Sequence, residues 1–451
     1  MTMLSLTGLA AAELEFVPEA AGHYRQALLE NRKAVEKLRA EEVGKLTPEA
    51  RAALLARKTA VIEKYAPHWV AEFAAYDRLL GWPEGDFLLV RGDVYETQEC
   101  TSWIVGPDLT ESGRMMLQKC RDNRRFRLGV SIQRSPGKLR WLRISNADSQ
   151  AAVYVMNEAG FALVMNNGDR CRDIGGGMAF GSPGTLRLAA ETCHNVEEGI
   201  ALLTKLAAAG EITGGQIYQM IDPQHAAVLE CGGGKVAVQR FERGFVCWTN
   251  SWKLPGMEAV SRMSPFRRNL NRFREEVAHA ALARAAEDGS LSLEELLAVS
   301  RTSERDRRGV WRGPYCKTSL GSALLVPDPE FPAFLSTAYI ALGPQQHTIY
   351  LPVALGVTAL PRPLIGGAWG DLAFNGFRRN YLSPHVAEFA ALERELIPAH
   401  LATLEEARGM LRQGDEAGAI ALLDRRFREQ ARAVWAKLNA AEAADAAERR
   451  K

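Results

Sequence analysis

The sequence lacks the features that identify several large classes of protein. It has no uninterrupted apolar run of about 18 residues, so no transmembrane helix is expected. It has no C-x-x-C pair, no P-loop and no dinucleotide fingerprint, because the glycine triplets at 175–177 and 232–234 fit neither glycine-rich pattern. These absences predict a protein that uses no metal and no cofactor.

The chain also lacks an excess of charge of either sign. Its 451 residues include 56 basic and 54 acidic ones, which gives a formal net charge of +2. This balance provides no long-range field that would attract nucleic acid or an acidic membrane, so we expect neither as a partner. With 47% hydrophobic and 24% charged residues, the composition is that of a soluble globular protein.

Cysteine is sparse and shows no pairing pattern. The seven cysteines are an odd number and are widely spaced, which favours reduced thiols and a cytoplasmic protein over a disulfide framework. Residues 1–12 lack the Lys or Arg that precedes the apolar stretch of a signal peptide. Because Ala10, Ala11 and Ala12 resemble a cleavage site, an exported form stays open.

Hydrophobic periodicity divides the chain into three parts: a helical part, a part rich in short strands, and a second helical part. The pattern of residues 1–99 predicts a helical leader. A first short strand is expected near its end, at Phe87–Val90. Residues 100–382 are rich in short strands separated by Gly, Pro, Asn and Asp, with helical stretches at 186–208 and 264–300. Strands, helices and strands again predict two sheets with helices outside them.

The third part, residues 383–451, is a helical extension. A long amphipathic stretch ends at Gln413-Gly414-Asp415, and helical sequence resumes at Glu416. The Ala-, Glu- and Arg-rich end, 440–451, is expected to fray. The sequence leaves the oligomeric state open, and a homo-oligomer is compatible with it.

One hairpin concentrates residues that could carry chemistry. The strand that starts at Cys100 is followed by a turn near residue 110 or 111 and by a strand near 114–120. Paired positions should then sum to about 220–222, which places Cys100 opposite residues 120–122. Asp122 can therefore reach the backbone nitrogen of Cys100, and a carboxylate there matters if that nitrogen is a free amine. Nearby Lys119 would lower the pKa of the thiol.

Each of these residues also has an ordinary structural interpretation. Cys100 could be one more buried thiol, because buried cysteines are common. Asp122 and Asn123 could be turn residues, and Asn250 could cap the end of a strand. Arg262 could form only surface ion pairs, as could Arg267 and Arg268 in the same stretch.

Four stretches, taken in order along the chain, resemble the motifs of one superfamily. They are Cys100-Thr101-Ser102 with Val105-Gly106, Ser112-Gly113 and Asp122-Asn123; Asn157-Glu158-Ala159-Gly160-Phe161; Val246-Cys247-Trp248-Thr249-Asn250; and Ser261-Arg262. The superfamily is that of the N-terminal-nucleophile cysteine hydrolases. The sequence is most similar to the dipeptidase family and the penicillin-type acyl-CoA acyltransferase family, and more distantly to bile-salt hydrolases and penicillin V acylases. The resemblance covers about residues 99–360.

This resemblance implies a fold and a self-activating chemistry. The fold is α+β, a four-layer αββα sandwich over residues 100–382, with the helical leader 1–99 and the helical extension 383–451. Relatives cut the bond before the nucleophile, which here is Glu99–Cys100, and the cut leader stays bound as a second chain. Cys100 then carries a free α-amine with a pKa of about 7.7–8.0, which can take the proton of the thiol.

The resemblance also assigns roles to individual residues. Asp122 would orient the amine of Cys100, and Asn250 would donate to the oxyanion, where such a donor is worth roughly 3–4 kcal/mol. Arg262 would form a hydrogen bond near the nucleophile, and Asn167 matches a further oxyanion donor. Two departures stand out: Glu99 occupies a position where the acyltransferases often have Gly, and Lys119 stands where some relatives carry Arg.

The predicted function is hydrolysis of a linear amide bond in a small N-acyl amine or dipeptide, through an acyl-enzyme on Cys100. The nearest alternative is acyl transfer from an acyl-CoA or amide donor to an amine. An alternative of another class is a non-catalytic ligand-binding protein that keeps the fold and an intact Glu99–Cys100 bond. The substrate's acyl and amine groups cannot be inferred from the sequence.

Overall fold

The structure is a computed structural model. It describes residues 14–90, 99–123, 127–148, 152–168, 171, 181–212 and 214–448.

The described part of the chain is built around two antiparallel sheets. The first has the strand order β10-β9-β8-β7-β6-β5-β4, a simple meander in which neighbours in sequence are neighbours in space. Its strands are β4 (Leu128–Gln133), β5 (Trp141–Asn146), β6 (Tyr154–Asn157), β7 (Ala162–Asn167), β8 (Gln216–Ile221), β9 (Ala226–Gly232) and β10 (Lys235–Phe241).

The second sheet combines strands that are far apart in the sequence. Its order is β11-β2-β3-β14-β15-β16, so that the first hairpin of the middle region lies between a strand from near residue 245 and one from near residue 320. The strands are β2 (Glu99–Val105), β3 (Met116–Asp122), β11 (Phe245–Trp248), β14 (Ser319–Val326), β15 (Thr337–Leu342) and β16 (Leu351–Ala354).

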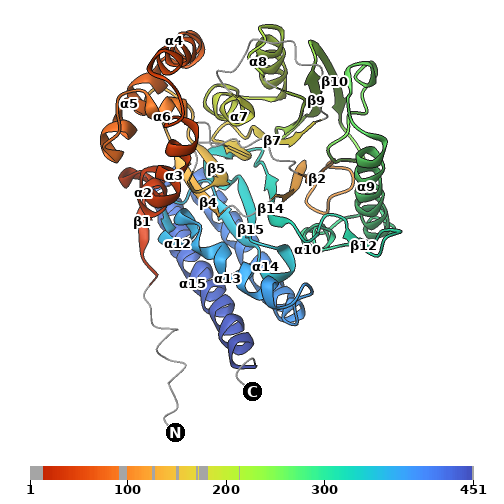
Figure 1. Ribbon diagram of the computed structural model, residues 1–451. Helices are drawn as coiled ribbons and strands as arrows, with labels where there is room; N and C mark the ends of the chain where they lie inside the picture. Colours follow the sequence, from red (N-terminus) through yellow and green to blue (C-terminus); the bar gives the residue numbers. More distant parts are fainter. Residues whose placement is uncertain are drawn as a thin grey trace.

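The two sheets stack face to face with helices on both outer faces, which confirms the predicted four-layer αββα sandwich (Figure 1). Contacts between β2 and β7 and between β3 and β8 join the inner faces. The helices α7 (Gly181–Thr192) and α8 (Val196–Ala208) cover the first sheet. The second sheet is covered by α9 (Pro265–Ala285), α10 (Leu293–Val299), α13 (Ala368–Arg379), α14 (Val386–Arg412) and α15 (Glu416–Glu448).

Alternation along β2 decides which layer each side chain enters. Ile104 belongs to the apolar cluster between the sheets, whereas Trp103 and Val105 belong to the cluster beneath α9 and α10. Because successive side chains of a strand point to opposite faces, Cys100 and Ser102 share the inter-sheet face with Ile104.

The leader is helical, as predicted, and packs against the sandwich. Its first strand, β1 (Phe16–Pro18), pairs antiparallel with β17 (Ala359–Pro361) from the far end of the middle region, residues 100–382. The leader's elements after β1 are η1 (Glu19–Ala21), α2 (His23–Glu30), α3 (Arg32–Glu42), α4 (Pro48–Tyr65), α5 (His68–Leu80) and α6 (Asp86–Leu89). The N-terminus of α4 is capped by Thr47, whose hydroxyl accepts a hydrogen bond from the Ala50 backbone N–H at 3.2 Å.

The strand predicted at Phe87–Val90 is wrong, because this segment forms the helical turn α6. The carboxylate of Asp77 accepts hydrogen bonds from the backbone N–H groups of Gly85 (2.7 Å) and Phe87 (2.8 Å), which holds the start of the turn. A short apolar run cannot by itself distinguish a buried strand from a buried helical turn. The tertiary contact with Asp77 decides the outcome.

The C-terminal extension is a helical hairpin of α14 and α15 that packs along α13 and β16. Of the stretch 440–451 that was expected to fray, residues 440–448 are helical as the end of α15, and the rest lies outside the described residues. Arg379 of α13 pairs with Glu442 at 2.5 Å, and His385 lies 3.0 Å from Asp445. These contacts hold the last turns against the body.

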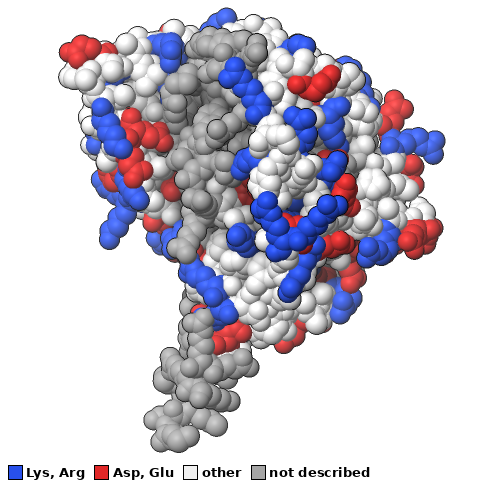
Figure 2. All heavy atoms as spheres, turned by 45° about the vertical axis from the view of Figure 1, so that its right-hand side comes forward, with Lys and Arg blue, Asp and Glu red and all other residues white. Residues whose placement is uncertain are grey.

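The remaining short elements connect these layers. They are η2 (Glu258–Val260), β12 (Glu304–Arg305), β13 (Trp311–Arg312), α11 (Pro332–Leu335), η3 (Gln345–His347) and α12 (Arg362–Gly366). On the side of the molecule that bears α9, Lys and Arg side chains are spread with Asp and Glu among them (Figure 2). Among the described residues, we find no helix with the length and apolar character needed to cross a membrane.

Candidate active site

The hairpin that begins at Cys100 has the predicted register. In the pairing of β2 with β3, Cys100 lies opposite Arg121 and Glu99 lies opposite Asp122. The second sheet therefore brings the predicted nucleophile and the predicted carboxylate to the same end of two neighbouring strands.

Cys100 is 1% exposed, and its thiol faces the layer between the sheets beside Lys119. Lys119 is fully buried. It pairs with Ser102 in the hairpin, so its side chain shares the inter-sheet face with Cys100, two residues away along β2. The Lys119 Nζ also donates to the backbone oxygen of Met165 and to the Asn166 Oδ1 at 2.9 Å. Burial lowers the pKa of Lys119, and the negative charge of a Cys100 thiolate opposes this shift.

The backbone nitrogen of Cys100 is bound by a predicted site residue. Asn250, just after β11, accepts a hydrogen bond from the Cys100 N–H on its Oδ1 at 2.7 Å. The Asn250 Nδ2 donates to the backbone oxygen of Asn167 at 2.7 Å. The structure thus brings Cys100, Asn250 and Asn167 together, while the oxyanion roles expected of the two asparagines stay predictions.

Asp122 lies on the other face of the same sheet, towards α9. Its Oδ1 accepts a hydrogen bond from the Ser319 hydroxyl at 2.8 Å, and its Oδ2 lies 3.5 Å from the Arg274 Nη1. Burial raises the pKa of the Asp122 carboxyl to about 7, although Arg274 and the Ser319 hydrogen bond favour the ionised form. A carboxyl poised near neutrality in this position can respond to a new charge on Cys100.

Arg274 of α9 joins these groups, and sequence reasoning did not single it out. It is fully buried, and its guanidinium donates to the Asn250 Oδ1 at 2.7 Å and to the Cys100 backbone oxygen at 3.3 Å. The same group pairs with Asp122. Asn271, one turn earlier on α9, accepts from the Arg274 Nη2 at 3.0 Å and fixes its orientation.

Arg262, the arginine expected near the nucleophile, lies elsewhere. It is exposed in the segment between η2 and α9. Its side chain makes no hydrogen bond or ion pair in the part of the chain that the structure describes. Of the arginines near Ser261 and in α9, Arg274 is therefore the one that hydrogen bonds to Cys100.

A second group of polar residues lies beneath the thiol and links the two sheets. The hydroxyl of Ser102 on β2 accepts hydrogen bonds from the Asn166 Nδ2 (2.7 Å) on β7 and from Gln219 on β8. Asn166 also binds Lys119 through its Oδ1. Since each of these residues is buried, the network fixes the position of Lys119 relative to Cys100.

The motif Asn157-Glu158-Ala159-Gly160-Phe161 has a structural part in this arrangement. The Asn157 Oδ1 accepts from the backbone N–H groups of Ala159 and Phe161, both at 3.1 Å, and Gly160 adopts a φ of 84°. This closes the tight turn between β6 and β7, the strand that carries Asn166 and Asn167.

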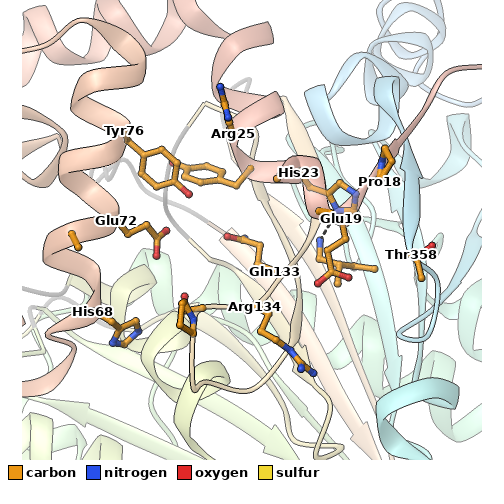
Figure 3. A pocket seen from close by; sticks show the side chains of 17 residues that line it. Pro18, Glu19, His23, Arg25, His68, Glu72, Tyr76, Gln133, Arg134 and Thr358 are labelled. Carbon is orange, nitrogen blue, oxygen red and sulfur yellow. Dashed lines mark hydrogen bonds between the residues drawn. The ribbon is translucent and has the colours of Figure 1, made fainter.

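A cavity of about 1100 Å³ lies between the leader and the sandwich (Figure 3). Tyr76 and Glu72 from α5, His23 from α2 and Gln133 from the end of β4 point towards it. None of the predicted site residues lines it. Gln133 ends β4, whereas Asn146, which accepts from Arg121 beside Cys100, pairs with Leu128 at the other end of that strand. The cavity is therefore separate from the Cys100 cluster.

Comparison with known proteins gives matches among solved structures alone, since no family model and no curated protein matches the chain. A mutant conjugated bile acid hydrolase from Clostridium perfringens aligns with a TM-score of 0.39 and 11% identity, covering 57% of this chain and 92% of that one. The Caenorhabditis elegans ortholog of N-acylethanolamine-hydrolyzing acid amidase gives 0.37 and 11%, covering 51% and 95%. Penicillin V acylase from Agrobacterium tumefaciens gives 0.33 and 13%, covering 57% and 86%.

Proposed function

We propose that this protein is a cysteine amidohydrolase that activates itself by cutting the Glu99–Cys100 bond. It then hydrolyses a linear amide bond in a small N-acyl amine or dipeptide. One observation carries the proposal: Asn250 and Arg274 bind the backbone nitrogen and oxygen of the residue whose thiol would react, and Asp122 lies beside them. Every buried backbone group needs a partner, but around Cys100 these partners are linked side chains that include the buried ion pair of Arg274 and Asp122.

The chemistry follows from the release of the Cys100 nitrogen. After scission, the free α-amine has a pKa near 7.7–8.0 and can take the thiol proton. The thiolate attacks the substrate carbonyl, the ammonium returns its proton to the leaving amine, and an acyl-enzyme remains. Water then attacks the thioester and releases the acid. The Asn250 Oδ1, which now accepts the amide N–H, would hold the amine in place.

Asp122 would balance the positive charge that scission creates on the Cys100 nitrogen, while the matching negative charge forms on the new Glu99 carboxylate. It lies opposite Glu99 in the sheet, so its carboxylate would be next to the new chain end. A second cation near Asp122, in addition to Arg274, would lower the pKa of this carboxyl from about 7 and keep it ionised at neutral pH. The ionised form would in turn orient the amine.

We also propose that the cut leader stays attached. Besides the pairing of β1 with β17, Glu191 of α7 accepts hydrogen bonds from His68 and from the indole of Trp69, both at 2.7 Å. Although burial alone would raise it, Arg187 and these hydrogen bonds hold the pKa of Glu191 at about 2. Cutting one bond breaks none of these contacts.

Incubation of the purified protein should convert it into two fragments, residues 1–99 and 100–451, that elute together from a native sizing column. Intact mass measurement under denaturing conditions identifies the fragments and thereby the scissile bond. A full-length mass after prolonged incubation, together with no alkylation of Cys100, would contradict the proposal and favour the non-catalytic binding protein.

A competition experiment separates hydrolysis from acyl transfer. N-acyl amino acids, dipeptides, acylated amines and an acyl-CoA are incubated with the processed protein and an excess of a primary amine. Free acid as the main product from the amides is the expected result, because water suffices to release the acyl-enzyme. Predominant formation of a new amide, above all from the acyl-CoA, would show a transferase instead. Mass spectrometry of the products measures both.

A further inference from the structure

Self-cleavage has to proceed without the α-amine that would serve as base in later substrate turnover. In the uncut chain, the Cys100 nitrogen is an amide whose N–H donates to Asn250, so it cannot accept the thiol proton. The α-amine that would serve as base in substrate hydrolysis does not yet exist. Self-cleavage, on which the proposed function rests, therefore needs another proton acceptor beside the thiol.

Several ionisable groups lie near the Cys100 thiol, and they differ in their ability to accept its proton. Arg121 lies opposite Cys100, but a guanidinium is always protonated and accepts no hydrogen bond. Asp122 belongs to the other face of the sheet, where it binds Arg274 and Ser319. The hydroxyl of Tyr154 on β6 faces the backbone oxygen of Gly321 at 3.5 Å, and burial raises its pKa. Lys119 lies on the same face of the sheet as Cys100, two residues away along the hairpin, and its buried Nζ can accept a proton when it is neutral.

The hydrogen bonds of Lys119 fit a neutral amine. A neutral ε-amine has two N–H donors and one lone pair. Two acceptors, the Met165 backbone oxygen and the Asn166 Oδ1, are in place for the donors. The lone pair is then left for the Cys100 thiol, which lies on the same face of the sheet two residues away along the hairpin. Within the described residues Lys119 pairs with no carboxylate, so no anion in contact holds it in the charged form. Burial favours the neutral form as well.

We infer that Lys119 is the base that removes the thiol proton of Cys100 when the chain cuts itself. The proton passes from Sγ to Nζ, and Sγ attacks the carbonyl carbon of Glu99. As the bond from that carbon to the Cys100 nitrogen breaks, the nitrogen takes the proton from the Lys119 ammonium. A thioester now joins Glu99 to Sγ, and water hydrolyses it to the Glu99 carboxylate and the Cys100 thiol. The new α-amine then serves as base in substrate turnover.

The test follows the rate of scission in freshly synthesised full-length protein, sampled over time and quantified by mass, from pH 5 to pH 9. Lys119→Arg keeps the positive charge but removes the base, so scission should slow by about 10²-fold or more, the usual contribution of a general base. The wild-type rate of scission should rise with pH as Lys119 loses its proton. In Lys119→Arg, which has no such base, the rise should occur at higher pH, where the thiol loses its proton to solvent. The charged groups that act on this titration are Arg121, Asp122 and the thiol itself.

A second variant reports on chemistry rather than on folding. In Lys119→Ala, added methylamine or ethylamine should fill the vacated space and restore scission in proportion to its free-base concentration. Lys58→Arg is the matched control, since Lys58 is also buried and also donates to backbone oxygens, those of Leu88 (2.9 Å) and Leu89 (3.4 Å). It should cut at the wild-type rate.

The outcomes separate this inference from the proposed function. If the wild-type chain never cuts, the proposed function fails. If the wild type cuts and folded Lys119→Arg cuts equally fast with the same pH profile, the base is another group and the inference is overturned. Should Lys119→Arg fail to fold, absence of amine rescue in Lys119→Ala overturns it equally.

Discussion

Cys100→Ala is expected to remain a single uncut chain and to lose amide hydrolysis by at least about 10⁴-fold, because the variant has no nucleophile for either reaction. Folding should be little affected, since the substitution removes only one sulfur atom from a buried position. Intact mass reports on the cut, and release of free acid from the best substrate of the panel reports on turnover.

Cys120→Ala is the matched control for this experiment. Cys120 is also fully buried, but its thiol lies on the opposite face of the sheet, 3.4 Å from the hydroxyl of Ser322. Burial raises the pKa of this thiol, so it is an inert group. Scission and turnover in Cys120→Ala should stay within a few-fold of wild type. Unchanged turnover in Cys100→Ala would refute the proposed function altogether.

Arg274→Met is expected to reduce turnover by at least about 10²-fold and to lower the free energy of unfolding by about 3–5 kcal/mol at neutral pH. The substitution removes the donors to Asn250 and to the Cys100 carbonyl, and it leaves Asp122 buried without its cation. Denaturant unfolding and the kinetics of amide hydrolysis measure the two effects.

The loss of stability in Arg274→Met should depend on pH. Without the guanidinium, the pKa of Asp122 rises above its value of about 7 in the native protein. A carboxyl whose pKa is raised on folding is stabilising below the pKa of the unfolded chain, and this contribution is lost as the pH rises through the folded value. The deficit should therefore be smaller near pH 4, where only the lost hydrogen bonds to Asn250 and Cys100 contribute, than at pH 8.

Arg262→Met decides between the arginine that the sequence suggested and the one that the structure places at the site. Because Arg262 is exposed, its loss should change stability by less than about 0.5 kcal/mol and leave turnover nearly unchanged. A severe loss of activity in Arg262→Met, with Arg274→Met close to wild type, would show that the expectation from the sequence was right.

Local sequence determined much of the site in advance. Turn residues and the alternation of side chains along a strand are properties of neighbouring residues, so the β2–β3 hairpin and its register could be predicted from Cys100 to Asp122. The same local rules failed at Phe87–Val90, because four apolar residues fit either a strand or a helical turn and only Asp77 selects the turn.

The sequence by itself determined the layered α+β architecture, the strand that carries Cys100 and the Asp122 carboxylate at the same end of the neighbouring strand. Only the tertiary structure decided that Arg274, among the arginines of its stretch, is buried against Cys100, and that Ser102, Asn166 and Gln219 connect the two sheets beneath the thiol. The physical reason is that hairpin geometry depends on a few adjacent dihedral angles. Contacts between a helix and a sheet, or between stacked sheets, depend on how whole elements pack. The spacing of residues along the chain does not predict this packing.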